Sequence, residues 1–193
     1  MSYTSTLERA KPRLAVDHRK LGMWLFLASE VMFFSGFIAT FIHHKVRDPA
    51  ASNVLDVGFT AVNTSLLLTS SFTMVMALAS LRRHRLFAVW NFLLLTAVLG
   101  AGFLFGQSLE FEKLIRSGVT LHTIFGSTFF CLTGFHGFHV FIGLLWCAYV
   151  MSKVFRFQVT GPEHALTLDL FGLYWHFVDV VWIILFTIIY LIR

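Results

Sequence analysis

Apolar residues gather along this chain into five long stretches separated by short polar segments. The stretches cover residues 21–42, 57–81, 86–112, 123–152 and 171–193. Each reaches the roughly 20 residues that a helix needs to cross about 30 Å of hydrocarbon. None shows the apolar–polar alternation of a membrane β-strand. The pattern therefore predicts an all-α integral membrane protein with five transmembrane helices in one bundle.

Composition excludes most other classes of protein. Of the 193 residues, 57% are hydrophobic and 13% charged, against about 25% charged in ordinary soluble domains. Too little polar sequence remains to cover five such helices in water, which excludes a soluble enzyme. We expect residues 1–20 to form an N-terminal tail and residues 21–193 a single transmembrane domain. All three prolines lie outside the stretches, so unbroken helices are expected, unlike those of many transporters.

Basic residues are distributed unevenly between the two sides of the predicted membrane. Ten Lys and Arg residues fall on the side of the N-terminus and five on the other. The positive-inside rule then places the N-terminus in the cytoplasm and the C-terminus outside. The positive charge thus reports topology, and no nucleic-acid partner is expected. Four aromatic residues near the predicted cytoplasmic helix ends are expected to be interfacial anchors: Trp24, Trp90, Tyr149 and Trp175.

Five ionisable residues fall well inside the predicted spans: Glu30, His136, His139, His176 and Asp179. A charge at mid-membrane costs at least about 2.5–3.5 kcal/mol, so each needs a reason to be there. Distances along the helices place Glu30, His139 and Asp179 at a similar depth, where the three could meet. His176 and Asp179 are three residues apart on one helix face and could bond each other. His136 and His139 have the same spacing.

Glu30 has the least favourable surroundings of these residues, because its helical neighbours are phenylalanines. A carboxyl without a partner in such surroundings would stay neutral. One hypothesis makes Glu30 a proton-exchanging or reactive carboxyl. The other makes it an inter-helix hydrogen-bond partner of His139 or His136.

A metal site is a further possibility that the spacing raises. His136 and His139 together with Glu30 and Asp179 give a conceivable mononuclear site. Carboxylate di-iron bundles, however, use Glu-x-x-His on two helices, and this pattern does not occur here. We therefore expect no metal bound by this chain.

The outer half of the third span carries a second polar group. Gln107 and Glu110 lie near its outer end and are expected to reach interfacial water. Gly102 and Gly106 form a GxxxG pattern, which allows close helix approach. We interpret this pattern as packing within the bundle.

Four stretches resemble subunit III of the haem–copper oxidases. Residues 21–36, with Glu30, resemble the glutamate-bearing helix of that family, and residues 107–111 its Gln-x-x-Glu-aromatic helix end. Residues 126–140 resemble its Gly-Phe-His-Gly-x-His helix, and residues 174–182 its last-helix signature. The four stretches occur in the family's order and span most of the chain. The number of spans resembles the five-helix bacterial form rather than the seven-helix form.

The resemblance implies a non-catalytic subunit of an aerobic respiratory oxidase in the bacterial inner membrane. In that family, subunit III has no redox centre, the haems and copper lie in partner subunits, and phospholipid can be bound. The implied partners are subunit I, by direct packing, subunit II and membrane lipids. The implied role is to stabilise subunit I and to support proton uptake during oxygen reduction. Glu30 matches the family's carbodiimide-reactive carboxyl.

Three other functions remain open at this point. The chain could be subunit III of a quinol oxidase rather than of a cytochrome c oxidase, or the related accessory subunit of a nitric-oxide reductase. It could also be an independent proton-coupled transporter or membrane metal enzyme.

Overall fold

The computed structural model describes residues 18–45, 56–161 and 164–192. These residues form five long helices and no strand, which confirms the predicted fold class. The helices are α1 (His18–Lys45), α2 (Val57–Arg82), α3 (Leu86–Arg116), α4 (Ile124–Phe155) and α5 (Ala165–Phe186). The π-helix η4 (Thr187–Leu191) continues α5. All five are long and apolar enough to cross a membrane.

The helices extend beyond most of the predicted spans, because their ends carry polar residues that lower the local hydropathy. The largest difference is at α5, which begins at Ala165 rather than at residue 171. Its first turns contain Asp169, whose carboxylate lies 3.1 Å from Lys20 Nζ and 3.9 Å from Arg82. Partnered charges are tolerated where a helix reaches the headgroup region. The helix therefore continues past the apolar core of the span.

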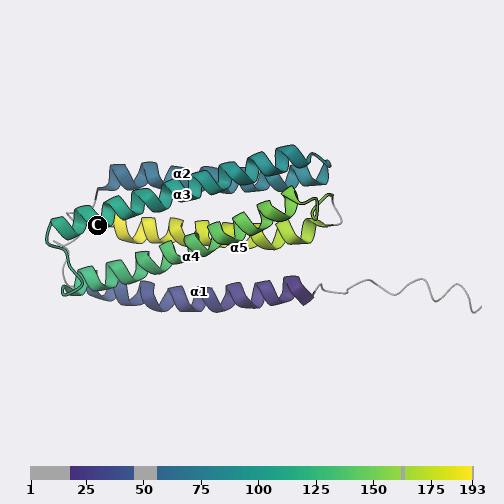
Figure 1. Ribbon diagram of the computed structural model, residues 1–193. Coiled ribbons are helices and arrows are strands. Elements are labelled where there is room, and N and C mark those ends of the chain that lie inside the picture. The colour runs from purple at the N-terminus through teal and green to yellow at the C-terminus, as the bar shows by residue number, and fades with distance from the viewer. Residues whose placement is uncertain (1–17, 46–55, 162–163, 193) are drawn as a thin grey trace, which may run out of the picture.

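Successive helices run in opposite directions through one bundle (Figure 1). We call the end where α1 begins, with the α2–α3 turn and the start of α5, the N-terminal end. In the α2–α3 turn His84 has a φ of 55°. Helices α2 and α3 pack closely as a hairpin, and α4 and α5 lie between this hairpin and α1. Helix α1 packs mainly on α4 and α5, so much of its surface is exposed.

Trp175 fixes the distance between α3, α4 and α5. Its ring is fully buried, and its edge lies against Gly100 of α3 and Gly143 of α4, where an added Cβ would come within 2.9 Å of the ring. Its Nε1 donates a hydrogen bond of 3.0 Å to Ser70 Oγ of α2. The prediction that Trp175 is an interfacial anchor is therefore wrong, whereas Trp24 is exposed. A ring of this size needs two glycines because the neighbouring backbones must approach it directly.

The GxxxG pattern does mediate close packing, as expected. Gly106 lies against Asn63 of α2, where an added Cβ would come within 2.5 Å of Asn63 Oδ1. Asn63 Nδ2 donates a hydrogen bond of 3.1 Å to the carbonyl of Phe103. The absence of a side chain at Gly106 therefore lets a polar side chain of α2 reach the backbone of α3.

Asp56 connects the start of α2 to the end of α3, at the end of the bundle opposite to the N-terminal end. As the N-cap of α2, it accepts a 3.1 Å hydrogen bond from the backbone N–H of Phe59. Its second oxygen lies 2.9 Å from Lys113 Nζ. The Lys113 ammonium, followed by the Phe59 N–H, lowers the pKa of Asp56 below its ordinary value of 3.8.

This lowered pKa predicts an acid-dependent contribution to stability. A carboxyl whose pKa is lower in the folded state stabilises the fold above its ordinary pKa of 3.8, and this contribution is lost as the pH falls through the lowered value. Asp56→Asn keeps a capping oxygen but loses the charge. We expect wild type to unfold at a higher temperature than Asp56→Asn at neutral pH, and the difference to vanish in acid. A difference in Tm that is independent of pH would contradict this.

Candidate functional site

Glu30 of α1 and His139 of α4 form the principal polar contact between α1 and the rest of the bundle. Glu30 Oε2 lies 3.2 Å from His139 Nε2. Both side chains are largely buried, with 18% and 11% of their surface exposed. The contact confirms the predicted inter-helix hydrogen bond and selects His139 rather than His136 as the partner.

The hydrogen bonds of His139 determine where the protons of this pair lie. Its Nδ1 is 2.8 Å from the backbone carbonyl of Phe135, and because a carbonyl oxygen only accepts, Nδ1 carries a hydrogen. In a neutral ring Nε2 is then an acceptor, so the Glu30 carboxyl must donate to it. In a charged ring Nε2 donates to a carboxylate. Either way, one proton lies between Oε2 and Nε2, and the pair is a neutral couple or an ion pair.

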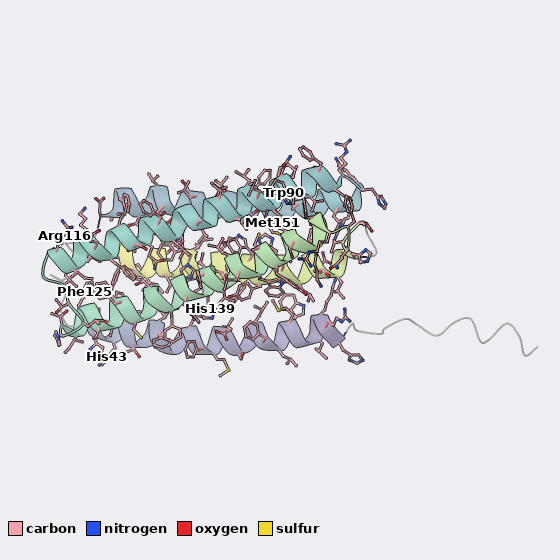
Figure 2. The ribbon with its side chains drawn as sticks, in the orientation of Figure 1. His43, Trp90, Arg116, Phe125, His139 and Met151 are labelled. Atoms are coloured by element: carbon pink, nitrogen blue, oxygen red, sulfur yellow. The ribbon has the colours of Figure 1, made fainter. Side chains whose placement is uncertain are left out.

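Aromatic side chains surround this pair and shield it from lipid. The Phe34 ring packs edge-on against His139, with centroids 5.2 Å apart. The Phe33 ring packs on Phe135, also at 5.2 Å. The Tyr174 hydroxyl donates a 2.9 Å hydrogen bond to the carbonyl of His139. Figure 2 shows His139 in the space between α4 and α1. The pair is thus held at one position by packing from three helices.

His136 lies apart from this pair despite its i, i+3 spacing. It is fully buried, and neither of its ring nitrogens has a hydrogen-bond partner among the described residues. Its ring stacks on Trp182 at 4.8 Å and meets Phe103 edge-on. In the part of the chain that the structure describes, no three His, Cys, Asp or Glu side chains are arranged to hold a metal.

Two expectations for α5 are wrong. His176 does not bond Asp179: His176 Nδ1 lies 2.6 Å from Ser71 Oγ of α2 instead. Asp179 does not join Glu30 and His139 either, since its buried oxygens make no hydrogen bond of good geometry within the described residues. The physical reason is that the His176 ring turns toward the neighbouring helix α2, so that its Nδ1 bonds Ser71 rather than the residue three positions along its own helix.

Gln107 and Glu110 are also placed differently from the prediction. Both are buried inside the bundle rather than in contact with interfacial water, because α3 continues to Arg116 beyond them. Gln107 Nε2 donates a 2.7 Å hydrogen bond to the carbonyl of Thr133 in α4. The Tyr190 and Thr60 hydroxyls lie 2.8 and 2.9 Å from Glu110 Oε1. Glu110 therefore joins α2, α3 and η4.

The hydroxyl partners of these groups are the residues that sequence reasoning missed. Most lie on α2, at Thr60, Thr64, Ser70 and Ser71, where they bond Glu110, Trp182, Trp175 and His176 respectively. The signal was present in the sequence, because polar residues recur along this apolar segment at helical spacing. A stripe of this kind inside a membrane span indicates a face that meets other helices.

The fold and these contacts define a class of protein, namely a five-helix membrane bundle with buried polar groups between its helices. The family model described as "Cytochrome c oxidase subunit III" matches residues 2–192. The chain belongs to this family, which confirms the resemblance found in the sequence.

Curated relatives agree with the family. The chain is 38% identical to quinol oxidase subunit 3 of Bacillus subtilis (strain 168), over 89% of this chain and 85% of the relative. It is 35% identical to cytochrome c oxidase subunit 3 of the same organism, over 94% and 89%. It is also 35% identical to a probable cytochrome c oxidase subunit 3 of Mycobacterium leprae, over 90% and 87%. The chain is thus a subunit of a respiratory haem–copper oxidase and an integral protein of the bacterial inner membrane.

Proposed function

We propose that this chain is the non-catalytic subunit III of a cytochrome c oxidase that reduces oxygen to water and pumps protons. In this proposal it packs directly against subunit I, shares the complex with subunit II, and contributes neither haem nor copper. Its task is to stabilise subunit I and to sustain proton uptake during turnover. Family membership over nearly the whole chain is the observation that carries the proposal.

The Glu30–His139 pair is the proposed site of proton-related function. One proton lies between two groups at mid-helix, and the side chains retain slight exposure. A carboxyl that shares a proton in apolar surroundings is also the kind that a hydrophobic carbodiimide attacks. His136 and the His176–Asp179 region lie outside this pair. Gln107 and Glu110 are proposed to hold the outer helix ends together.

Orientation and surroundings complete the proposal. The N-terminus is cytoplasmic and the C-terminus outside, with residues 1–20 as a tail and residues 21–193 as one transmembrane domain. Most of that tail, residues 1–17, lies outside the described residues, as do several of the basic residues that support the orientation. Membrane lipids, including bound phospholipid, are proposed to cover the exposed face of α1.

Quinol is the second candidate electron donor. The 38% identity to a quinol oxidase subunit 3 is slightly higher than the 35% identity to a cytochrome c oxidase subunit 3 of the same organism. The choice of donor would lie in the partner subunits, so both donors should be offered to the purified complex.

Glu30→Gln tests the proton-related role. A glutamine at this position can donate from its amide to His139 Nε2, which keeps the contact but removes the exchangeable proton. We expect the variant complex to assemble fully, to lose carbodiimide labelling of α1, and to inactivate during turnover as fast as a complex lacking this chain. Labelling is read by mass spectrometry, and inactivation from oxygen consumption over time.

The matched control is Glu112→Gln, which changes an exposed carboxyl at the end of α3. It should retain wild-type labelling and turnover lifetime. If Glu30→Gln also kept the wild-type lifetime, the pair would be purely structural and the proton-related role would be rejected. If the complex without this chain turned over indefinitely, the support role would be rejected as well.

A further inference from the structure

We propose that Asp179 is a proton-holding carboxyl, distinct from Glu30, that exchanges its proton with water at the N-terminal end of the bundle through Ser71 and His176. The observations are an unpartnered buried carboxyl, a hydrogen-bonded neighbour that leads toward the surface, and a groove that reaches that neighbour.

Asp179 is buried in the middle of α5 without the partners that a charge requires. Only 3% of its surface is exposed, and neither oxygen makes a hydrogen bond of good geometry among the described residues. Within the same residues it takes part in no ion pair. An isolated carboxylate in hydrocarbon costs far more free energy than the protonated acid. The side chain is therefore placed to carry a proton.

Ser71 and His176 connect this carboxyl to the neighbouring polar groups. The Ser71 hydroxyl of α2 lies 2.6 Å from His176 Nδ1 and is near enough to the Asp179 carboxyl to interact with it, without completing a hydrogen bond to either carboxyl oxygen. A hydroxyl both accepts and donates, so it can pass a proton between an imidazole nitrogen and a carboxylate. The three side chains form a short relay between α2 and α5.

A groove joins the relay to the N-terminal end of the bundle. It lies between α1, α2 and α5, has a volume of about 300 Å³, and is lined by residues that include Lys20, Met74, Leu78, Asp169 and His176. Several water molecules fit into such a volume. Its mouth carries the Lys20–Asp169 ion pair, whereas its inner end is His176. The groove thus runs from a charged mouth to the first member of the relay.

The charged and titratable groups that face this route come from three helices. Lys20 lies on α1, and Asp169 and His176 on α5, all lining the groove. Arg82 of α2 reaches Asp169 from outside the groove. Within the groove α2 contributes apolar side chains. Among the described residues, the charged side chains that line the groove are therefore the ion pair at its mouth, and none competes with Asp179 for a proton at the inner end.

The proton balance of one exchange is simple. A hydronium ion in the groove delivers a proton to the bare nitrogen of His176 and becomes water, and the other ring nitrogen releases its own proton to Ser71 Oγ. Ser71 transfers its original hydroxyl proton to a carboxylate oxygen of Asp179. Within the relay one N–H and two O–H bonds form while one N–H and one O–H bond break, and the remaining O–H bond breaks in the hydronium ion, so the carboxylate becomes an acid. Reversal of the same steps returns the proton to water.

The site is independent of the Glu30–His139 pair. That pair bonds α1 to α4, whereas the relay bonds α2 to α5. The two acids can therefore be distinguished by mutation, and failure of one assignment leaves the other intact.

Infrared spectroscopy of the assembled oxidase complex tests the proposal. The carbonyl stretch of a protonated carboxylic acid should be present in wild type and in Glu30→Gln, and should lose one component in Asp179→Asn. After transfer into heavy water this component should shift as the acid deuterates. Ser71→Ala, which keeps Asp179 but breaks the relay, should slow that shift at least tenfold.

Two further variants keep the test decisive. Ser65→Ala removes a lipid-facing hydroxyl of the same helix that bonds only its own backbone, and should exchange like wild type. Gly172→Leu fills the groove, which Gly172 lines, and should slow exchange like Ser71→Ala. The proposal is overturned if Asp179→Asn loses no acid component, or if Ser71→Ala and Gly172→Leu exchange at the wild-type rate. Should Asp179→Asn not assemble, the exchange rates of the other variants decide alone.

Discussion

Gly143→Ala is expected to destabilise the bundle strongly, although it adds only a single methyl group. The added Cβ would lie 2.7 Å from Cζ3 and 2.9 Å from Cε3 of Trp175. The ring cannot withdraw, because its other edge lies against Gly100 and its Nε1 is bonded to Ser70. Either Trp175 leaves its hydrogen bond or α4 moves away from α5. Overpacking of this kind costs about 1–3 kcal/mol.

The measurement is thermal unfolding of the detergent-solubilised protein, with Gly134→Ala as the matched control. Gly134 is on the same helix, but an added Cβ there meets nothing within 4 Å. Alanine also forms helix more readily than glycine, so Gly134→Ala should leave the Tm unchanged or raise it slightly. Equal Tm values for the two variants would show that Trp175 does not set the spacing of α3, α4 and α5.

Glu110→Ala is expected to have a comparably large effect on stability, because it removes the acceptor that joins three helices. The Tyr190 hydroxyl, 2.8 Å from Glu110 Oε1, would be left in a buried cavity without its acceptor, whereas the Thr60 hydroxyl, 2.9 Å from the same oxygen, would keep its bond to the backbone carbonyl of Asp56. Buried polar groups without partners cost about 1–3 kcal/mol each. We therefore expect a marked fall in Tm and early loosening of η4.

Glu112→Ala is the control for this prediction. Glu112 lies two residues away on the same helix, but its side chain is exposed and pairs with Arg116 one turn later. Exposed pairs contribute only about 0–1 kcal/mol. Tyr190→Phe should reproduce part of the Glu110→Ala effect, since it removes one of the two donors. A fall in Tm no larger than that of Glu112→Ala would contradict the proposed role of Glu110.

The sequence predicted the five helices because crossing a membrane imposes a length and a composition that are visible in any window of the chain. It did not predict where α5 begins, because Asp169 is polar by composition but is partnered by Lys20 in the structure. Local hydropathy contains no information about such partners. Trp175 was misplaced for a similar reason: its depth follows from glycines on two other helices.

The candidate site was predicted in part. The cost of a carboxyl among phenylalanines singled out Glu30, and matching depth identified His139 as one of two partners. Asp179 lies at a similar depth but does not join the pair, because depth fixes one coordinate and leaves the direction of the side chain open. In the structure Ser71 occupies the position beside His176 that Asp179 was expected to take. The hydroxyl residues of α2 lie within an apolar span, and hydropathy alone does not distinguish them as partners.

The most direct test of membership in an oxidase complex is mild-detergent purification through a tag on this chain, followed by an optical spectrum and mass spectrometry. We expect haem absorbance, a large co-purifying subunit with many spans, and reduction of the haems by cytochrome c or quinol. A tagged chain that remains in the membrane fraction without haem and without such a subunit, after crosslinking in intact membranes before solubilisation, would contradict the account.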